Sequence, residues 1–281
     1  MERFYILFKR NKLAVGSAFI LLVMVLAAVF ADWISPYAWN DQDVSRRLIP
    51  PIFQKGGDVR FLFGTDFLGR DILSYIIHGS KVSLIVGLAT VVIGGILGSV
   101  LGWIAGYFGG LTDRIIMRIA DIQLSFPYIL LALALAAVVG PGLWKLILVL
   151  GVSSWPVYGR IARGAILSEK EKDYIQSARA IGLSSLRTLV DHAIPNTLSP
   201  LVVVTTLQVG RMIIAEATLS FLGVGVPASV PTWGGLLNDG RSYLYNAWWI
   251  ATFPGMAIMM MVLAINIFGD AIRDILDPKT I

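Results

Sequence analysis

The sequence predicts an all-α membrane protein, a bundle of six transmembrane helices with both termini in the cytoplasm. Its 281 residues are 56% hydrophobic and 15% charged, with a mean hydropathy of +0.75. A soluble domain is about a quarter charged, so this composition is typical of a membrane protein. Apolar segments of bilayer-spanning length recur along the chain. Lys and Arg gather in alternate connecting segments, which is the distribution that sets membrane orientation.

The first apolar segment, residues 13–31, is an uncharged run of 19 residues that spans about 28 Å as a helix. Lys9, Arg10 and Lys12 precede it, and residues 29–31 form a weak cleavage site, so the segment also has features of a signal peptide. The run is longer than the apolar part of a usual signal peptide, and further spans follow it. An uncleaved first helix is therefore predicted.

Five further apolar segments predict the remaining spans. They are residues 82–107, 119–139, 143–161, 197–215 and 248–268. Pro127, Pro156 and Pro254 lie inside them, where neighbouring helices or water can satisfy the carbonyls that a proline leaves free. With the N-terminus inside, 14 of the 23 Lys and Arg residues fall on the cytoplasmic side, which favours this orientation.

These spans divide the chain into three regions. Residues 1–79 contain the first helix and an extracytoplasmic segment, residues 80–270 form a five-helix core, and residues 271–281 form a cytoplasmic tail. Pro50-Pro51 and Gly56-Gly57 make the outer segment loop-like. A second outer segment, between the last two spans, is rich in aromatic residues: Trp233, Tyr243, Tyr245 and Trp248. They form either an aromatic belt at the membrane surface or a platform for an extracytoplasmic partner.

Glycine recurs every four residues in the second span, at Gly94, Gly98, Gly102 and Gly106, and Gly110 continues the register. Residues four apart share one helix face, so these glycines form a nearly bare ridge. Such ridges let two membrane helices approach closely. The ridge packs either against another helix of this chain or across the interface with a second subunit.

The connection between the fourth and fifth spans, residues 168–195, predicts two short amphipathic helices. Ser168 and Glu171 fit a capping box that would start the first helix at Glu169. Its apolar face is formed by Tyr174, Ile175, Ala178 and Ile181. Gly182 stands where a helix-terminating residue with positive φ belongs.

Ser184 or Ser185 can begin the second helix, and Pro195 would end it. Its apolar face is formed by Leu186, Leu189, Val190 and Ala193. Connections in helical bundles are usually shorter than this one. The two helices either lie on the lipid headgroups or dock a cytoplasmic partner, and the pattern alone leaves both possibilities open.

Few residues could carry chemistry. His78 and His192 are the only histidines and fall on opposite sides of the membrane, so no metal site is predicted, and without cysteine no thiolate site is possible. Gly79-Ser80-Lys81 lacks the upstream glycine of a phosphate-binding loop, so ATP is expected to be handled by another chain. The net charge of +5 is scattered among the spans, and nucleic-acid binding is not expected.

Arg211 and Glu216 are placed at the outer end of the fifth predicted span. A charge at that position can reach the interface by extending its side chain, and this is the interpretation favoured for Arg211. Glu216 either faces a translocation path or caps a local turn.

Residues 176–182, followed by Ile194-Pro195, resemble the EAA loop of bacterial ATP-binding cassette (ABC) importer permeases. The spacing from Gly182 to Pro195 matches that loop. Gln176, Ser177, His192 and Ile194 depart from its usual residues, which removes one carboxylate but keeps the glycine and the proline. The resemblance implies that the loop contacts an ATPase subunit through Gln176, Ser177, Ala178, Arg179, Ala180, Gly182, Leu186, His192 and Pro195.

Six further motifs extend the resemblance along nearly the whole chain and are similar to the dipeptide, oligopeptide and nickel permeases. They occupy residues 64–71, 105–110, 124–127, 192–196, 216–223 and 269–278. The resemblance implies a type I permease in the cell inner membrane, a transport subunit rather than an enzyme. It implies a homologous permease, two ATPase subunits that hold the ATP and magnesium, and an extracytoplasmic solute-binding protein. The solute would be a peptide or a related compound such as a nickel chelate.

A secondary transporter subunit is the alternative. It would more often show inverted repeats and ionisable residues inside the spans for ion coupling, and no convincing repeat is present. A membrane enzyme would need clustered acid, base or metal residues at a span or its mouth, and the sequence predicts none.

Overall fold

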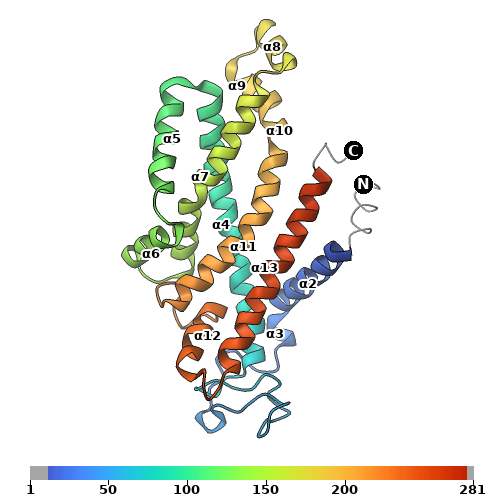
Figure 1. The fold of residues 1–281 in the computed structure, drawn as a ribbon, viewed down its shortest axis with the longest axis vertical. Coiled ribbons are helices and arrows are strands. Elements are labelled where there is room, and N and C mark those ends of the chain that lie inside the picture. Colours follow the sequence, from blue (N-terminus) through green and yellow to red (C-terminus); the bar gives the residue numbers. More distant parts are fainter. Residues whose placement is uncertain (1–11, 277–281) are drawn as a thin grey trace.

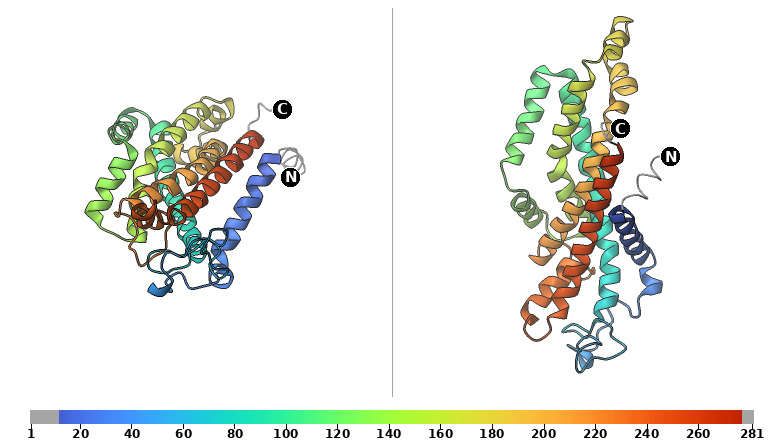
Figure 2. Two further views of the ribbon diagram at one scale, coloured as in Figure 1. Left: turned by 60° about the horizontal axis from the view of Figure 1, so that its bottom comes forward. Right: turned by 45° about the vertical axis from the view of Figure 1, so that its right-hand side comes forward.

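The computed structural model describes residues 12–276. Within that range the chain is helical, and its one β-bridge pairs Thr65 with Asp71. The longest helices run side by side along the long axis of the molecule (Figures 1 and 2). The all-α prediction is therefore confirmed for the described part of the chain.

The first two helices, α2 (Lys12–Val29) and α3 (Ala31–Ile34), lead into an irregular outer segment that contains only the short 3₁₀ helix η1 (Val44–Arg46). Helix α4 (Ile72–Phe108) then runs through the centre of the bundle. It starts ten residues before the predicted span because the Asp71 carboxylate accepts the backbone N–H of Ser74 at 2.8 Å and caps the helix. Hydropathy detected the apolar part of this helix and not its polar beginning.

The predicted third span, 119–139, is wrong as a single helix. The structure has α5 (Gly110–Leu124) and α6 (Tyr128–Val139), which meet at an angle of 91°. Pro127 lies in the break rather than inside a helix. A proline lacks the N–H that would continue the hydrogen-bond ladder and disfavours helical geometry in the residue before it.

Helix α7 (Leu143–Glu169) packs along α4, and the glycine ridge lies at this contact. A Cβ atom added to Gly98 or Gly102 would stand 2.3 Å from the carbonyl oxygen of Trp155 or Gly159, respectively. The ridge is therefore an intrachain contact, the first of the two sequence-based alternatives. Gly110 does not continue it, because the chain turns at Gly109 and Gly110, which both have positive φ.

The last long helices are α11 (Leu198–Phe221) and α13 (Trp249–Leu276), with α12 (Trp233–Gly240) and η3 (Arg241–Tyr243) between them. α11 runs six residues beyond the predicted span. α13 runs eight residues beyond it, so the described part of the predicted tail, 271–276, is helix; residues 277–281 lie outside the described range. Hydropathy bounds the most apolar part of a helix and places its ends only to within several residues. The main core joins side chains of α4, α7, α11 and α13, among them Val86, Leu150, Tyr158, Ile213 and Met261.

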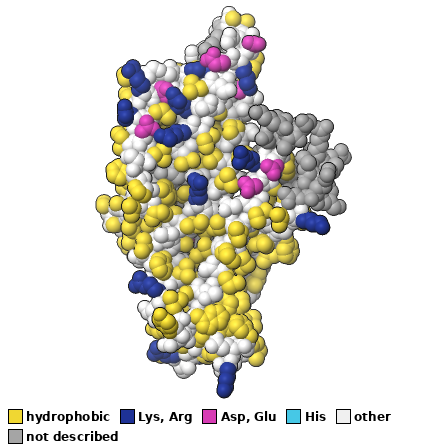
Figure 3. Space-filling view, in the orientation of Figure 1, with side chains coloured by type: hydrophobic (Ala, Val, Ile, Leu, Met, Phe, Trp, Pro, Cys, Tyr) yellow, Lys and Arg dark blue, Asp and Glu magenta, His cyan; other side chains and the backbone are white. Residues whose placement is uncertain are grey.

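Four of the described helices are long and apolar enough to cross a membrane, and the bent pair α5–α6 would supply a fifth. The four are α2, α4, α11 and α13. α7 is outside this set, so the count of six spans stays a prediction. On the face shown in Figure 3, charged side chains are most frequent toward the upper end, a smaller group lies at mid-height, and a broad hydrophobic area lies below it.

Candidate functional site

The connection between α7 and α11 projects beyond the bundle at one end (Figure 1) and is called the finger, residues 170–197. It contains α8 (Asp173–Ala180) and a second helical stretch formed by α9 (Ser185–Arg187), the π-helical η2 (Thr188–Ala193) and α10 (Ile194–Asn196). The predicted helix start at Glu169 is wrong, because Ser168 and Glu169 form the end of α7. A turn follows, and α8 starts at Asp173.

Two predictions for the finger are confirmed. Gly182 has a φ of +88°, in the left-handed region that terminates helices. Ser184 caps the second helix by accepting the backbone N–H of Arg187 at 3.4 Å. This helix does not end at Pro195 but continues to Asn196. The π-helical turn precedes the proline, and the Asn196 side-chain amide donates to the carbonyl of His192 at 2.8 Å.

The buried face of the finger differs from the predicted one. Ile175, Leu189 and Ala193 are buried together against Tyr107 of α4 and Ile166 of α7. Ala178 is also buried, whereas four of the predicted apolar-face residues are exposed: Tyr174, Ile181, Leu186 and Val190. Helical periodicity was right about amphipathicity but could not choose between adjacent apolar residues, since the supporting surface belongs to distant helices.

Polar contacts fix the finger to the bundle. Glu169, at the end of α7, pairs with Lys172 at 2.8 Å and accepts a hydrogen bond from the Tyr174 hydroxyl. Burial, together with this carboxylate, raises the pKa of Tyr174 to about 12. At the other end of the finger, Trp103 of α4 donates to the Thr197 hydroxyl at 3.0 Å. The finger is therefore held at both of its ends by helices of the core.

Most residues implied by the resemblance lie on the exposed surface of the finger. Gln176, Ser177, Ala180 and Leu186 are exposed, and Leu186 has 65% of its surface open. Ile181, at 77%, adds a second open apolar side chain beside Gly182. Of the others, Ala178 is buried, His192 is half-buried and Pro195 is exposed; the side chain of Arg179 lies outside the described part. The finger therefore presents exposed apolar side chains, while helices of the core support it at both of its ends.

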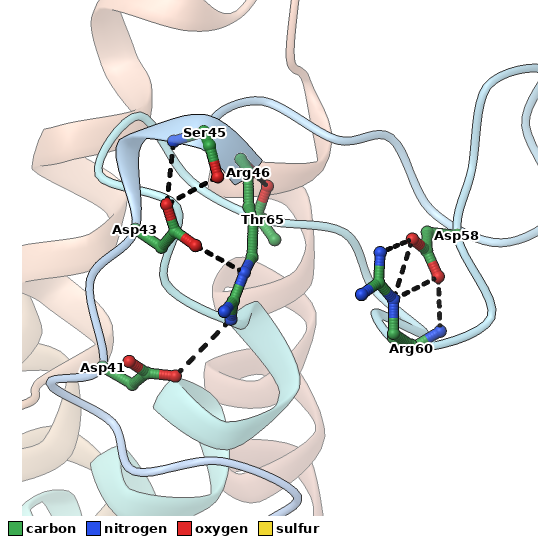
Figure 4. A network of polar contacts seen from close by, with 7 residues as sticks. All are labelled: Asp41, Asp43, Ser45, Arg46, Asp58, Arg60 and Thr65. Atoms are coloured by element: carbon green, nitrogen blue, oxygen red, sulfur yellow. Dashed lines mark hydrogen bonds and ion pairs between the residues drawn. The ribbon is translucent and has the colours of Figure 1, made fainter.

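The opposite end of the molecule carries an outer cap, which comprises residues 35–71 and α12 (Figure 1). Its surface is held by local pairs (Figure 4): Asp43 accepts from the Ser45 hydroxyl at 2.6 Å, and Arg46 pairs with Asp43 at 2.8 Å. Arg60 donates to Asp58 and holds the pKa of that exposed carboxyl at about 2. The segment is thus ordered although the sequence predicted only a loop.

Arg70 connects the two parts of the cap. The residue is 5% exposed, and its guanidinium donates to Asp66 and to Asp239 of α12, the latter at 2.9 Å, and lies 4.8 Å above the ring of Tyr75. Burial alone would lower the pKa of Arg70, but the Asp66 carboxylate raises it above the ordinary value. Sequence reasoning missed this cluster, because Arg70 and Asp239 are 169 residues apart and no local pattern links them.

The aromatic residues of the second outer segment do not form one belt. Trp233 is fully buried and donates to the carbonyl of Ile76 at 2.9 Å, whereas Tyr245 is fully exposed. Tyr243 stacks on Phe67 of the outer cap with 5.5 Å between ring centres. These rings therefore join the cap to the bundle, and only part of the set faces outward.

Glu216 lies within α11 and is 0% exposed. Its carboxylate accepts from the hydroxyl of Ser220 at 2.8 Å and from that of Ser83 of α4 at 3.4 Å. In this conformation it joins two helices and does not face an open path. Arg211 also lies inside α11, on its exposed face, so its predicted position at the outer end is wrong.

The two histidines lie at opposite ends of the molecule. His78, near the start of α4, has its Nε2 atom 3.2 Å from the carboxylate of Asp32, and His192 belongs to the finger. Among the described residues, no three His, Asp or Glu side chains gather into a possible metal site.

The bundle of apolar helices, with an exposed apolar finger at one end and an ordered cap at the other, is typical of a membrane protein, and the family matches identify it as a membrane subunit of a transport system. The chain belongs to the family described as binding-protein-dependent transport system inner membrane component, whose profile matches residues 98–281. Residues 2–51 match the N-terminal transmembrane domain of oligopeptide transport permease C. These matches confirm the family resemblance and the inner-membrane location.

Curated relatives cover nearly the whole chain. The di/tripeptide transport system permease protein DppC of Pseudomonas aeruginosa is 42% identical over 99% of this chain and 92% of its own length. The dipeptide permease DppC of Escherichia coli is 43% identical over 99% of this chain and 93% of its own length. The glutathione permease GsiD of Escherichia coli is 41% identical over 99% and 90%. The chain is thus a permease subunit of an ABC transporter.

Solved structures show the same fold. Two inward-facing structures of the MetNI methionine ABC transporter superpose with TM-scores of 0.61 and 0.62 at 20% identity. Each superposition covers 73% of this chain and 98% of the matched MetNI chain. At this identity the likeness concerns the fold alone, which is that of a type I permease.

Proposed function

We propose that this permease imports small peptides with a free carboxylate, powered by separate ATPase subunits. The observation that carries the substrate class is the 41–43% identity, over 99% of the chain, to permeases named for dipeptides, tripeptides and glutathione. A nickel chelate has no comparable support among these relatives, and neither has the secondary-transporter alternative. The complete transporter would also contain a homologous permease, two ATPase subunits and an extracytoplasmic binding protein. The ATPase subunits would hold the ATP and magnesium.

The proposed topology has six spans and both termini in the cytoplasm. The distribution of Lys and Arg supports it. So does the direction of the helices, since α13 runs from the outer cap toward the finger end and α2 runs the opposite way (Figure 1). The finger would then lie in the cytoplasm and the cap outside.

The finger is proposed to dock into an ATPase subunit. Its open apolar side chains are Ile181, which follows α8, and Leu186 of α9. α8 lies at the far tip of the molecule (Figure 1), while the buried face of the finger is already occupied by α4 and α7. A pair of helices lying on lipid headgroups would instead lie along the membrane surface. The cap is proposed as the platform for the binding protein.

Reconstitution tests the function. The chain, expressed with its neighbouring transporter subunits and placed in proteoliposomes with the binding protein, is expected to take up dialanine when ATP is supplied. The chain alone is expected to hydrolyse no ATP, since its sequence contains no phosphate-binding loop. Uptake that persists without ATPase subunits would refute the proposed mechanism.

Gly182→Val is expected to lower uptake about tenfold while membrane insertion stays normal. A Cβ at this position would meet open space, so the effect comes from backbone geometry alone. The left-handed region costs a residue with a Cβ about 1–2 kcal/mol, and 1.4 kcal/mol is a tenfold change in population. The measurement is uptake together with crosslinking of Ala180→Cys to cysteines in the ATPase.

Gly182→Asn is the matched control, because asparagine tolerates the left-handed region far better than valine. It should retain most of the uptake and the crosslink. Should Gly182→Val keep both at wild-type levels, the docking role of this turn is wrong, and the membrane-surface position of the two helices is preferred.

A further inference from the structure

Arg211 occupies an unusual position for a charged residue. It lies thirteen residues after the start of α11 at Leu198 and ten before its end at Phe221. At 1.5 Å per residue, it is roughly 15 Å or more from either end of the helix. The whole of α11 is long and apolar enough to cross a membrane, and an arginine side chain cannot reach either end of it from this position. The snorkelling interpretation depended on a shorter span that ends at residue 215.

The side chain of Arg211 points away from its own bundle. It is exposed, whereas its neighbours Met212 and Ile213 are buried against the core. Val204, Leu207, Ile214 and Thr218 follow the same face of α11 at intervals of three or four residues. Arg211 is the one charged residue among them.

The one hydrogen bond described for this guanidinium is to its own helix. Nη1 donates to the Oε1 atom of Gln208 at 3.3 Å, and Gln208 is itself only 3% exposed. This contact orients the guanidinium but supplies no negative charge to compensate its positive charge. A charge at membrane depth is expensive unless it faces water or an opposite charge. Since the chain's own core lies on the opposite side of α11, the compensating water or anion must come from outside this chain.

One turn outward from Arg211, an apolar groove of about 310 Å³ opens between α11, α12 and α13. Ile214 and Thr218 line it from α11, Leu237 from α12 and Ile258 from α13. An apolar recess beside a single fixed polar group is the usual composition of a small-molecule site. A guanidinium suits carboxylates in particular, because its planar fork matches both oxygens.

We propose that the outer face of α11 lines the translocation path and that Arg211 receives the carboxylate of the passing peptide. The groove beyond it would accommodate an apolar side chain of the same peptide. This inference rests on the proposed peptide substrate and adds the residue that contacts it. It makes the middle of the path electropositive.

The first test measures the electrostatic potential near Arg211 with a reporter thiol. The chain has no cysteine, so Ile214→Cys introduces a single thiol one turn from Arg211. In the complete reconstituted transporter, with partner cysteines removed, the thiol is treated with a negatively charged and a positively charged methanethiosulfonate. The ratio of their rates should favour the anionic reagent. A unit charge about 6 Å away in water changes each rate by about threefold in opposite directions, so Arg211→Gln should lower the ratio by about tenfold.

Leu263→Cys is the matched control, an exposed position midway along α13 that should react with neither reagent. The inference is overturned if the Ile214→Cys thiol reacts with neither reagent. It is also overturned if Arg211→Gln leaves the ratio of the two rates unchanged. Separation of the two permeases by Arg211→Gln overturns it as well, since this would show that Arg211 pairs with the partner permease.

The second test is dialanine uptake by the same transporter. Arg211→Gln is expected to lower uptake about tenfold while ATP hydrolysis remains, and Arg211→Lys should retain an intermediate rate because it keeps the charge but loses the fork. Unchanged uptake by Arg211→Gln overturns the carboxylate contact. If wild-type transporter takes up no dialanine although the reporter shows the charge preference, the proposed substrate fails and the electropositive path stands.

Discussion

Gly102→Leu is expected to abolish the folded bundle. A Cβ at Gly102 would lie 2.3 Å from the carbonyl oxygen of Gly159 and 2.7 Å from the Cβ of Ala162. The first of these atoms is backbone, so the clash can be relieved only by separating α4 from α7. Overpacking costs about 1–3 kcal/mol even where side chains can move, and a leucine here should exceed that range. The measurement is the yield of monodisperse protein after mild detergent extraction.

Gly164→Leu is the matched control. Gly164 lies in α7, in helical geometry, and a Cβ there would meet nothing within 4 Å. Both variants lose a helical glycine and gain the same side chain, so a difference between them reports the contact alone. Equal yields from the two would mean that the α4–α7 contact does not stabilise the fold.

Arg70→Met is expected to loosen the outer cap and to lower the thermal midpoint by several degrees. The variant leaves the Asp66 carboxylate, 1% exposed, without its cation, and breaks the link to Asp239 of α12. Removing one partner from a buried ion pair costs about 3–5 kcal/mol, because the remaining charge stays buried. Asp66 keeps the backbone N–H of Leu68 and of residue 70, at 2.8 and 2.9 Å, which places the expected loss at the lower end.

Arg60→Met provides the comparison in the same cap. The pair of Arg60 with Asp58 is exposed, with 66% of the arginine side chain open to solvent. Exposed pairs contribute little, so the thermal midpoint should not move. Limited proteolysis of residues 35–71 gives a second readout: cleavage should be faster in Arg70→Met and unchanged in Arg60→Met. Equal behaviour of the two variants would contradict the role given to Arg70.

Much of the candidate site could be predicted from local pattern. The left-handed turn at Gly182 and the cap at Ser184 depend on residues within a few positions of each other, and both are present. The start of α8 was predicted incorrectly, because the capping box at Ser168 lies inside a helix that is already under way. α7 continues to Glu169, whose side chain is buried and pairs with Lys172. A capping pattern is therefore informative only where the preceding residues leave the helix.

The sequence by itself determined the all-α class, the family and the two-helix finger, because these depend on hydropathy, on spacing along the chain and on local turn geometry. The tertiary structure alone decided that the glycine ridge packs against α7, that Arg70 reaches Asp239 and that Arg211 lies in the middle of α11 on an open face. Each of these depends on which distant helix lies opposite or on where a helix ends. A pattern of three or four residues carries no information about a neighbour that is far away in the chain.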